Sequence, residues 1–140
     1  MIRTLLTGAL TLCLMGMGVN EPTKAKIGEK VTNFTIVDTQ GVEHSLEQYT
    51  KEGKIVVLEW FNPGCPVVKG YHKGATESAM AKTVKAATTD HDVVWLAVNS
   101  GGKGKQGHGA EVNEKARKEW KLDYPVLLDE SGKVGKMMGA

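Results

Sequence analysis

One stretch of the sequence decides the fold: IVVLEWFNPGCPVVK, residues 55–69. Its first half, Ile55 to Phe61, is an almost unbroken apolar run rich in β-branched residues, which predicts a central strand covered on both faces. A helix is predicted from Pro66 to Ala87, because proline fits the first turn of a helix, where its missing N–H is not needed. Cys65 therefore lies between the end of a buried strand and the start of a helix.

The rest of the chain repeats this alternation of strand and helix. Further apolar runs predict strands at Phe34–Val37, Val93–Val98 and Val126–Leu128, and a helix at Glu111–Trp120 whose apolar face carries Val112, Ala116 and Trp120. Within the helix from Pro66, Gly70 and Gly74 weaken the first half. Strands that alternate with helices imply crossover connections, so we expect an α/β protein with a mainly parallel sheet between two layers of helices.

Cys65 is the best candidate for chemistry. In parallel sheets, functional residues gather at the carboxyl ends of the strands, and Cys65 lies a few residues beyond such an end. A thiol at a helix N-terminus faces free N–H groups and the positive end of the helix dipole, which favour the reactive thiolate. Pro66 begins this helix, Lys69 adds positive charge one turn later, and His72 adds more if the helix brings it near.

Glu59 is a carboxylate within a strand that is otherwise apolar. A buried acid keeps its proton more readily than an exposed one, so Glu59 is a candidate to relay a proton to or from the Cys65 thiol through water. The alternative is structural: Cys65 is then an inert small hydrophobe, and Glu59 emerges at a sheet edge.

The N-terminal residues have the pattern of an export signal. Arg3 precedes an apolar run from Leu5 to Met15, which is short for a membrane-spanning helix of ~20 residues. Cys13 lies in this run, so the mature protein is expected to carry Cys65 as its single thiol, with no disulfide partner in the chain.

We therefore expect a signal peptide at residues 1–19, a linker at 20–26 and one domain at 27–140, in a protein located in the periplasm or outside the cell. An uncleaved membrane anchor is the alternative for residues 1–19. Beyond the export signal, the sequence predicts no contact with a membrane.

The charges favour no particular class of partner. The chain has 18 basic and 16 acidic residues, and these are interspersed, as in the run Glu114 to Glu119. A nucleic-acid-binding protein is expected to show a strongly basic face with interleaved aromatic residues, which this pattern lacks.

A glycine-rich segment, Ser100 to Gly109, follows one predicted strand. Within it, Gly102 to Gly107 fits the pattern G-x-G-x-x-G of dinucleotide-binding loops, with Asp129 at roughly the expected distance downstream. A single match is weak in a run this rich in glycine, and the dinucleotide motif normally follows the first strand of its unit. We expect a flexible loop beside the active site, with contact to an anion or a partner as the alternative, and no bound cofactor.

The four histidines, His44, His72, His91 and His108, are dispersed and lack the spacing of metal ligands. We expect ordinary surface histidines and no metal site.

Several segments together carry a family resemblance. Residues 27–35, 41–46 and 124–134 are similar to the opening, the following turn and a later strand of redoxins, a group of the thioredoxin-like superfamily related to alkyl hydroperoxide reductase and thiol-specific antioxidant (AhpC/TSA) proteins. In this resemblance the family's nucleophilic cysteine falls on Cys65, and its buried acid, six residues earlier, falls on Glu59. The resemblance implies a thioredoxin-like fold and thiol–disulfide or peroxide chemistry.

Three departures from the family pattern narrow this expectation. The family's second, resolving cysteine falls on Val68, which excludes a two-cysteine cycle within one chain. The peroxiredoxin signature has proline and threonine or serine where this chain has Leu58 and Asn62, so dedicated peroxidase activity is disfavoured. The sequence ends at Gly139-Ala140, where redoxins continue into a hairpin and a helix, so we expect these to be missing, with an open sheet edge and marginal stability.

The sequence thus predicts an exported oxidoreductase that acts through Cys65, with a thiol or disulfide of another molecule as its partner and peroxide as an alternative oxidant. The alternative is a noncatalytic binding module of thioredoxin-like fold that carries a partner or a metal.

Overall fold

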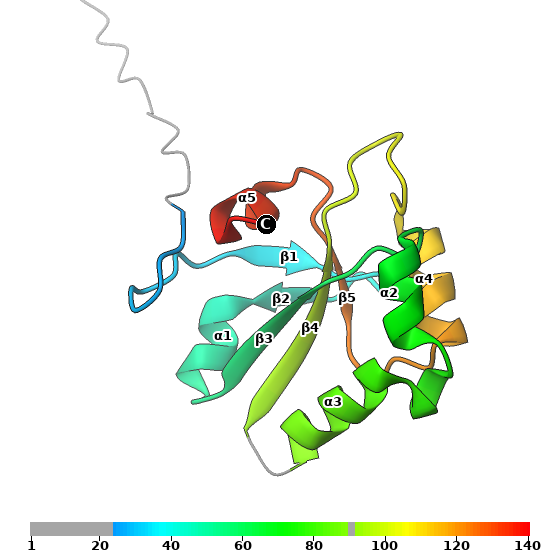
Figure 1. The fold of residues 1–140 in the computed structure, drawn as a ribbon. Coiled ribbons are helices and arrows are strands. Elements are labelled where there is room, and N and C mark those ends of the chain that lie inside the picture. Colours follow the sequence, from blue (N-terminus) through cyan, green and yellow to red (C-terminus); the bar gives the residue numbers. More distant parts are fainter. Residues whose placement is uncertain (1–23, 90–91) are drawn as a thin grey trace, which may run out of the picture.

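The computed structural model describes residues 24–89 and 92–140, which form a sheet with helices on both faces (Figure 1). In chain order the elements are β1 (Thr35–Val37), β2 (Glu43–Ser45), α1 (Leu46–Lys51), β3 (Ile55–Trp60), α2 (Pro66–His72), the 3₁₀ turn η1 (Ala75–Glu77), α3 (Ala79–Thr89), β4 (Val93–Asn99), α4 (Ala110–Glu119), β5 (Val126–Leu128) and α5 (Lys133–Met138). Helices α2, α3 and α4 lie on one side of the sheet, and α1 and α5 on the other.

The main sheet is parallel, with the strand order β3-β4-β5. Strands β1 and β2 pair with each other antiparallel, and a bridge between Asp38 and Leu127 places the end of β1 beside β5. The α/β class and the parallel sheet predicted from the sequence are therefore confirmed.

One part of that prediction is wrong, because β4 and not β3 is the central strand. Among the described residues β3 pairs only with β4, and Ile55 at its start is 60% exposed. A continuous apolar run does not distinguish a central strand from an edge strand, since both pack against helices.

The central strand divides the core into two clusters. Leu96 and Val98 point to the side of α1 and α5, where they pack with Phe34, Leu127 and Met137. The alternate residues of the same strand point to the other side, as expected from the two-residue period of a strand. There Trp95 and Ala97 pack in a second cluster with Phe61, Val84, Ala116, Leu122, Tyr124, Val126 and Trp120.

The predicted helix from Pro66 to Ala87 is in fact two helices. Helix α2 ends at His72, and Gly74 then adopts a left-handed conformation with φ of 99°. Glycine reaches this conformation without a steric penalty, so it can end a helix where other residues would continue it. The chain makes the turn η1 and begins again as α3, which allows α2 and α3 to point in different directions (Figure 1).

The other elements agree with the predictions from the sequence to different degrees. Strand β5 and helix α4 agree with their predictions to within a residue, whereas β2, α1 and α5 were not predicted as regular elements. Each of these three has only three to six residues, too few for a clear periodic pattern. On α4 the buried Ala116 is in the core as predicted, but Val112 is 48% exposed.

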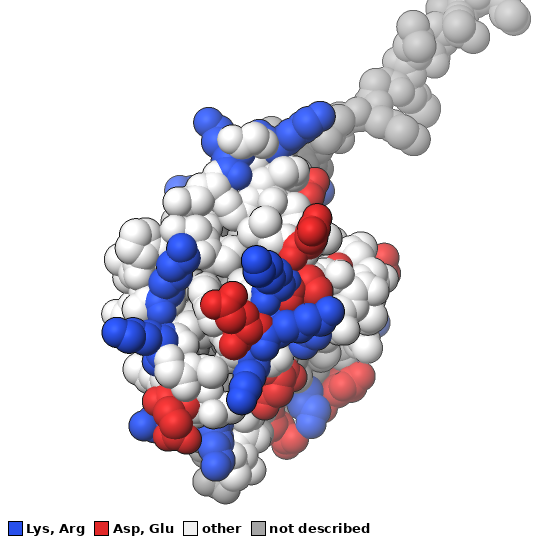
Figure 2. Space-filling model, turned by 90° about the vertical axis from the view of Figure 1, so that its right-hand side faces the viewer, with Lys and Arg blue, Asp and Glu red and all other residues white. Residues whose placement is uncertain are grey.

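The predicted signal peptide and Cys13 lie outside the described residues. In the part of the chain that the structure describes, every helix is too short or too polar to cross a membrane. On the face that carries α2 and α4, basic and acidic side chains are interleaved (Figure 2).

Candidate active site

Cys65 is the N-cap residue of α2, just beyond the carboxyl end of β3. Its N–H donates to the carbonyl of Asn62 at 3.0 Å, and its own carbonyl accepts from the N–H of Lys69 at 3.0 Å. The thiol is half-buried and forms no disulfide within the described residues. It lines a pocket of about 590 Å³.

The opposite wall of this pocket, which we call the Cys65 pocket, is the glycine-rich loop of residues 100–109. Ser100, Gly101, Gly102, Lys105 and Gln106 of this loop line the pocket, and among the described residues Lys105 is the one charged residue that does so. The structure thus places this loop beside Cys65.

Three asparagines hold the loop in place. Asn62 donates from Nδ2 to the carbonyl of Gln106 at 3.1 Å. Asn113, which is completely buried, donates to the carbonyls of Gly107 at 2.7 Å and Gly109 at 2.8 Å. Asn99 is the third, and it bonds to Asn113 and to Gly101. The wall of the Cys65 pocket is therefore a fastened loop.

Asn99, at the end of β4, links Asn113 to the start of the loop. It donates from Nδ2 to Oδ1 of Asn113 at 2.9 Å and accepts from the N–H of Gly101 at 2.8 Å. None of the three asparagines was predicted from the sequence to hold the loop. A usable signal was present, since Asn62 and Asn99 each directly follow an apolar strand, at the sheet edge where functional residues gather.

The close approach of the loop to β3 requires glycine at position 107. Gly107 has φ of 76°, and a Cβ atom there would lie 2.4 Å from Oδ1 of Asn62. Any other residue would combine backbone strain with a steric clash. The glycine at position 107 of this glycine-rich loop thus has a structural explanation.

Glu59 lies inside the cluster on the α2 side and accepts three hydrogen bonds. Its Oε1 accepts from Nε2 of His72 at 2.8 Å, and its Oε2 accepts from Nε1 of Trp95 at 3.0 Å and from the hydroxyl of Tyr124 at 3.1 Å. The side chains of Glu59 and His72 are 7% and 1% exposed. Three donors around one carboxylate compensate for its removal from water.

Neighbouring groups complete this buried network. Burial, together with the negative charge of Glu59, raises the pKa of Tyr124 well above its usual range, so its hydroxyl remains a donor. The ring of His72 stacks on Trp120, with the ring centroids 4.9 Å apart, and meets Phe61 edge to face. We refer to Glu59, His72, Trp95 and Tyr124 as the Glu59 network.

The structure separates the predicted site residues into two groups. Cys65 and Pro66 lie at the Cys65 pocket or beside it, whereas Glu59 and His72 belong to the Glu59 network, and no hydrogen bond joins the two groups among the described residues. Lys69 lines a different pocket, between α2 and α4. The prediction of a surface histidine is wrong for His72, because Glu59 provides a buried acceptor for it.

No group of three or more metal-binding side chains is present in residues 24–89 and 92–140.

Comparison with known proteins relates this arrangement to a family. The model of the AhpC/TSA family matches residues 27–140. The chain belongs to the AhpC/TSA family. No curated protein matched the sequence significantly.

Solved structures confirm that this AhpC/TSA chain has a thioredoxin-like fold. A hypothetical protein of Sinorhizobium meliloti 1021 matches with a TM-score of 0.65 and 20% identity over 81% of this chain and 59% of its own. The peroxidoxin BcpB of Mycobacterium tuberculosis matches with a TM-score of 0.58 and 20% identity, over 80% of this chain and 64% of its own.

A secreted disulfide oxidoreductase of Mycobacterium tuberculosis, described as homologous to Escherichia coli DsbE, matches with a TM-score of 0.56 and 17% identity over 74% of this chain and 66% of its own. The chain thus spans 59% to 66% of the length of these three proteins.

Proposed function

We propose that this AhpC/TSA protein is a thiol-dependent oxidoreductase in which Cys65 is the nucleophile. The observation that carries the proposal is the position of Cys65 in an accessible pocket at the end of β3, with Lys105 as the only charged residue in the lining. The family and the fold of the solved structures agree with thiol chemistry at this position.

The proposed reaction is thiol–disulfide exchange. The Cys65 thiolate attacks one sulfur of an external disulfide, a mixed disulfide forms, and the other sulfur leaves as a thiolate. A second thiol from outside the chain then attacks the mixed disulfide and releases Cys65. Val68 lines the Cys65 pocket where the family has its resolving cysteine, so the second thiol must come from another molecule.

Peroxide is the alternative oxidant. In that reaction the thiolate attacks one oxygen of the O–O bond, which yields a sulfenic acid and releases water or an alcohol. An external thiol then condenses with the sulfenic acid, releases water and leaves the same mixed disulfide.

Other residues have supporting roles in this proposal. Pro66 starts α2 and so fixes the direction of the first-turn N–H groups beside Cys65. Glu59 and His72 hold α2 against the sheet through their hydrogen bond, and a proton relay from Glu59 to Cys65 would have to run through water. Lys69 adds positive charge in the last turn of α2, at the α2–α4 side and outside the lining of the Cys65 pocket.

The proposal extends to export. Residues 1–19 act as a signal peptide, residues 20–26 as a linker and residues 27–140 as the redoxin domain, which would work in the periplasm or outside the cell. Secretion of the full-length gene product followed by N-terminal sequencing tests this part, and an uncleaved Met1 in the mature protein would contradict it.

A noncatalytic binding module is the competing function, and Val68 in place of a second cysteine favours it. The two functions differ in the reactivity of Cys65. A binding module needs no accelerated exchange, whereas the oxidoreductase requires that the folded protein reacts with a disulfide faster than an ordinary thiol does.

The test is reaction of the full chain with glutathione disulfide, followed by mass spectrometry. The Cys13→Ser variant isolates the Cys65 thiol. We expect one glutathione adduct, formed roughly tenfold faster in the folded than in the urea-unfolded protein at pH 7 and removed by a reducing thiol. The double variant Cys13→Ser/Cys65→Ser should form no adduct. Equal rates for folded and unfolded protein would favour the binding module.

A further inference from the structure

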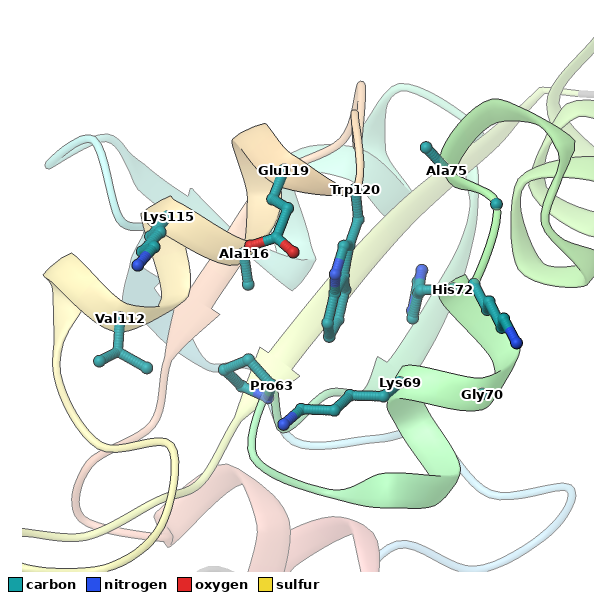
Figure 3. A pocket seen from close by; sticks show the side chains of 12 residues that line it. Pro63, Lys69, Gly70, His72, Ala75, Val112, Lys115, Ala116, Glu119 and Trp120 are labelled. Atoms are coloured by element: carbon teal, nitrogen blue, oxygen red, sulfur yellow. The ribbon is translucent and has the colours of Figure 1, made fainter.

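A second pocket lies between α2 and α4, and none of its lining residues belongs to the Cys65 pocket. We call it the α2–α4 pocket. Its volume is about 810 Å³, within the range of small-molecule binding sites. Figure 3 shows Trp120 and His72 lying side by side within it, with Lys69 extending towards Pro63 and with Lys115 projecting from α4.

The buried imidazole of His72 offers this pocket a free hydrogen-bonding atom. Its Nε2 donates to Glu59, but its Nδ1 has no partner among the described residues. In the same part of the chain no fully buried side-chain nitrogen or oxygen lacks a partner, so Nδ1 lies at the edge of the molecular surface, although the His72 side chain as a whole is only 1% exposed. The surface that His72 lines is the α2–α4 pocket.

The tautomer of His72 decides what Nδ1 offers. Because Nε2–H donates a hydrogen bond to the Glu59 carboxylate, the tautomer with its proton on Nε2 presents a lone pair at Nδ1. Trp95 and Tyr124 also donate to Glu59, which keeps the carboxylate in the role of acceptor. The floor of the pocket therefore accepts a hydrogen bond from an O–H or N–H group.

The charges around the pocket are mainly positive. Lys69, Lys73 and Lys115 line it, against the single carboxylate of Glu119. None of these four residues forms an ion pair within the described part of the chain. By contrast, Lys118 of α4, which does not line the pocket, pairs with Glu114 at 3.5 Å. The excess of lysine over carboxylate around one concave site favours an anionic ligand.

An apolar wall limits the kind of anion. Val112 is 48% exposed into this region, and Pro63, Ala116 and the indole of Trp120 continue the apolar surface. Apolar surface combined with a few polar groups is typical of sites for small organic molecules.

We propose that the α2–α4 pocket binds a small organic anion, whose carboxylate or phosphate contacts Lys69, Lys73 and Lys115 and whose hydroxyl or amino group donates a hydrogen bond to Nδ1 of His72. The apolar part of the ligand lies against Val112 and Trp120. This site is independent of Cys65 chemistry, and a Cys65→Ser protein binds the anion equally well.

Isothermal titration of the full chain at constant ionic strength tests the site, with citrate as the carboxylate probe and inorganic phosphate as the phosphate probe. We expect saturable binding of at least one of the two. The variant Lys69→Gln/Lys115→Gln should weaken it about tenfold. The control Lys82→Gln/Lys85→Gln removes the same charge from exposed positions of α3 and should leave binding within twofold of the wild type.

Two further measurements test the role of His72. Tricarballylate has the carboxylates of citrate without its hydroxyl, so a citrate-binding pocket should bind it several-fold more weakly. In His72→Gln the amide can still donate to Glu59, but Nδ1 is lost, and the preference for citrate should disappear. Absence of saturable binding for both anions, or equal weakening in the α3 control, would overturn the proposal. If His72→Gln fails to fold, the comparison of Lys69→Gln/Lys115→Gln with Lys82→Gln/Lys85→Gln tests the proposal.

Discussion

The two ends of α2 are built in opposite ways. At its start, Cys65 lies half-buried beside a loop that is held by asparagine amides, and its thiol has no disulfide partner within the described residues. At its end, His72 is almost completely buried and donates from Nε2 to Glu59. The seven-residue helix is thus anchored in the core at its end, whereas the thiol at its start lines the Cys65 pocket. The difference teaches that stability and reactivity should respond to different substitutions.

The largest expected effect comes from breaking the Glu59 network. In Glu59→Ala the donors of His72, Trp95 and Tyr124 lose their common acceptor inside the core. We expect a loss of about 3–5 kcal/mol in the free energy of unfolding, measured with urea. The control Glu77→Ala removes a carboxylate that is 81% exposed and should change it by less than about 0.5 kcal/mol. Equal effects of the two substitutions would contradict the role of the network.

The next largest effect on stability is expected at Asn113, which holds the loop beside Cys65 at the start of α2. In Asn113→Ala, two loop carbonyls lose a donor and the Asn99 amide loses an acceptor. We expect a loss of about 2 kcal/mol in the free energy of unfolding. Amide hydrogen exchange should also accelerate more in residues 100–109 than in β3, relative to the wild type. The exposed Gln40, replaced by Ala, is the control. Unchanged exchange in the loop would show that the asparagines do not hold it.

Acid should weaken the contact between α4 and the turn after β1. Hydrogen bonds from Arg117 and then from Thr39 lower the pKa of Glu114 to about 2. A lowered carboxyl pKa contributes stability above the ordinary value of 4.5 that is lost as the pH falls towards about 2. Because Glu114 is partly exposed, we expect about 1 kcal/mol of additional loss in the wild type relative to Glu114→Gln. Parallel stability curves for the two proteins would contradict this contribution.

The smallest expected change in stability is that of Cys65→Ser. The thiol is half-buried, so the free energy of unfolding should change by less than about 0.5 kcal/mol, as measured with urea. In the Cys13→Ser background the same substitution should abolish all thiol reactivity. A loss of several kcal/mol would instead identify Cys65 as a core residue, which is the structural alternative stated from the sequence.

The long elements and the position of Cys65 between a strand and a helix could be predicted from the sequence, because both depend on local pattern. Strand β4 and helix α4 have clear periodicity, and Cys65 directly follows an apolar strand. The break at Gly74 could not be placed, since a glycine inside a helix weakens it without always ending it. The position of β3 at the sheet edge depends on which distant segments of the chain pair with it. The composition of the strand alone does not show this pairing.

The polar contacts of the site were predicted least well. Glu59 was recognised as unusual, but its three donors come from α2, β4 and the segment before β5, which are far apart in sequence. His72 looked like an ordinary surface residue for the same reason. The spacing of residues along one helix does not show which carboxylate, distant in sequence, packs against that helix in the fold.

The most direct test of the central claim is the rate of alkylation of Cys65 by iodoacetamide, in the full-length Cys13→Ser protein at pH 7, folded and in urea. If α2 and Lys105 activate the thiol, the folded protein should react roughly tenfold faster although its thiol is half-buried. A folded protein that reacts at the same rate as the unfolded chain, or more slowly, would contradict the assignment of Cys65 as a catalytic nucleophile.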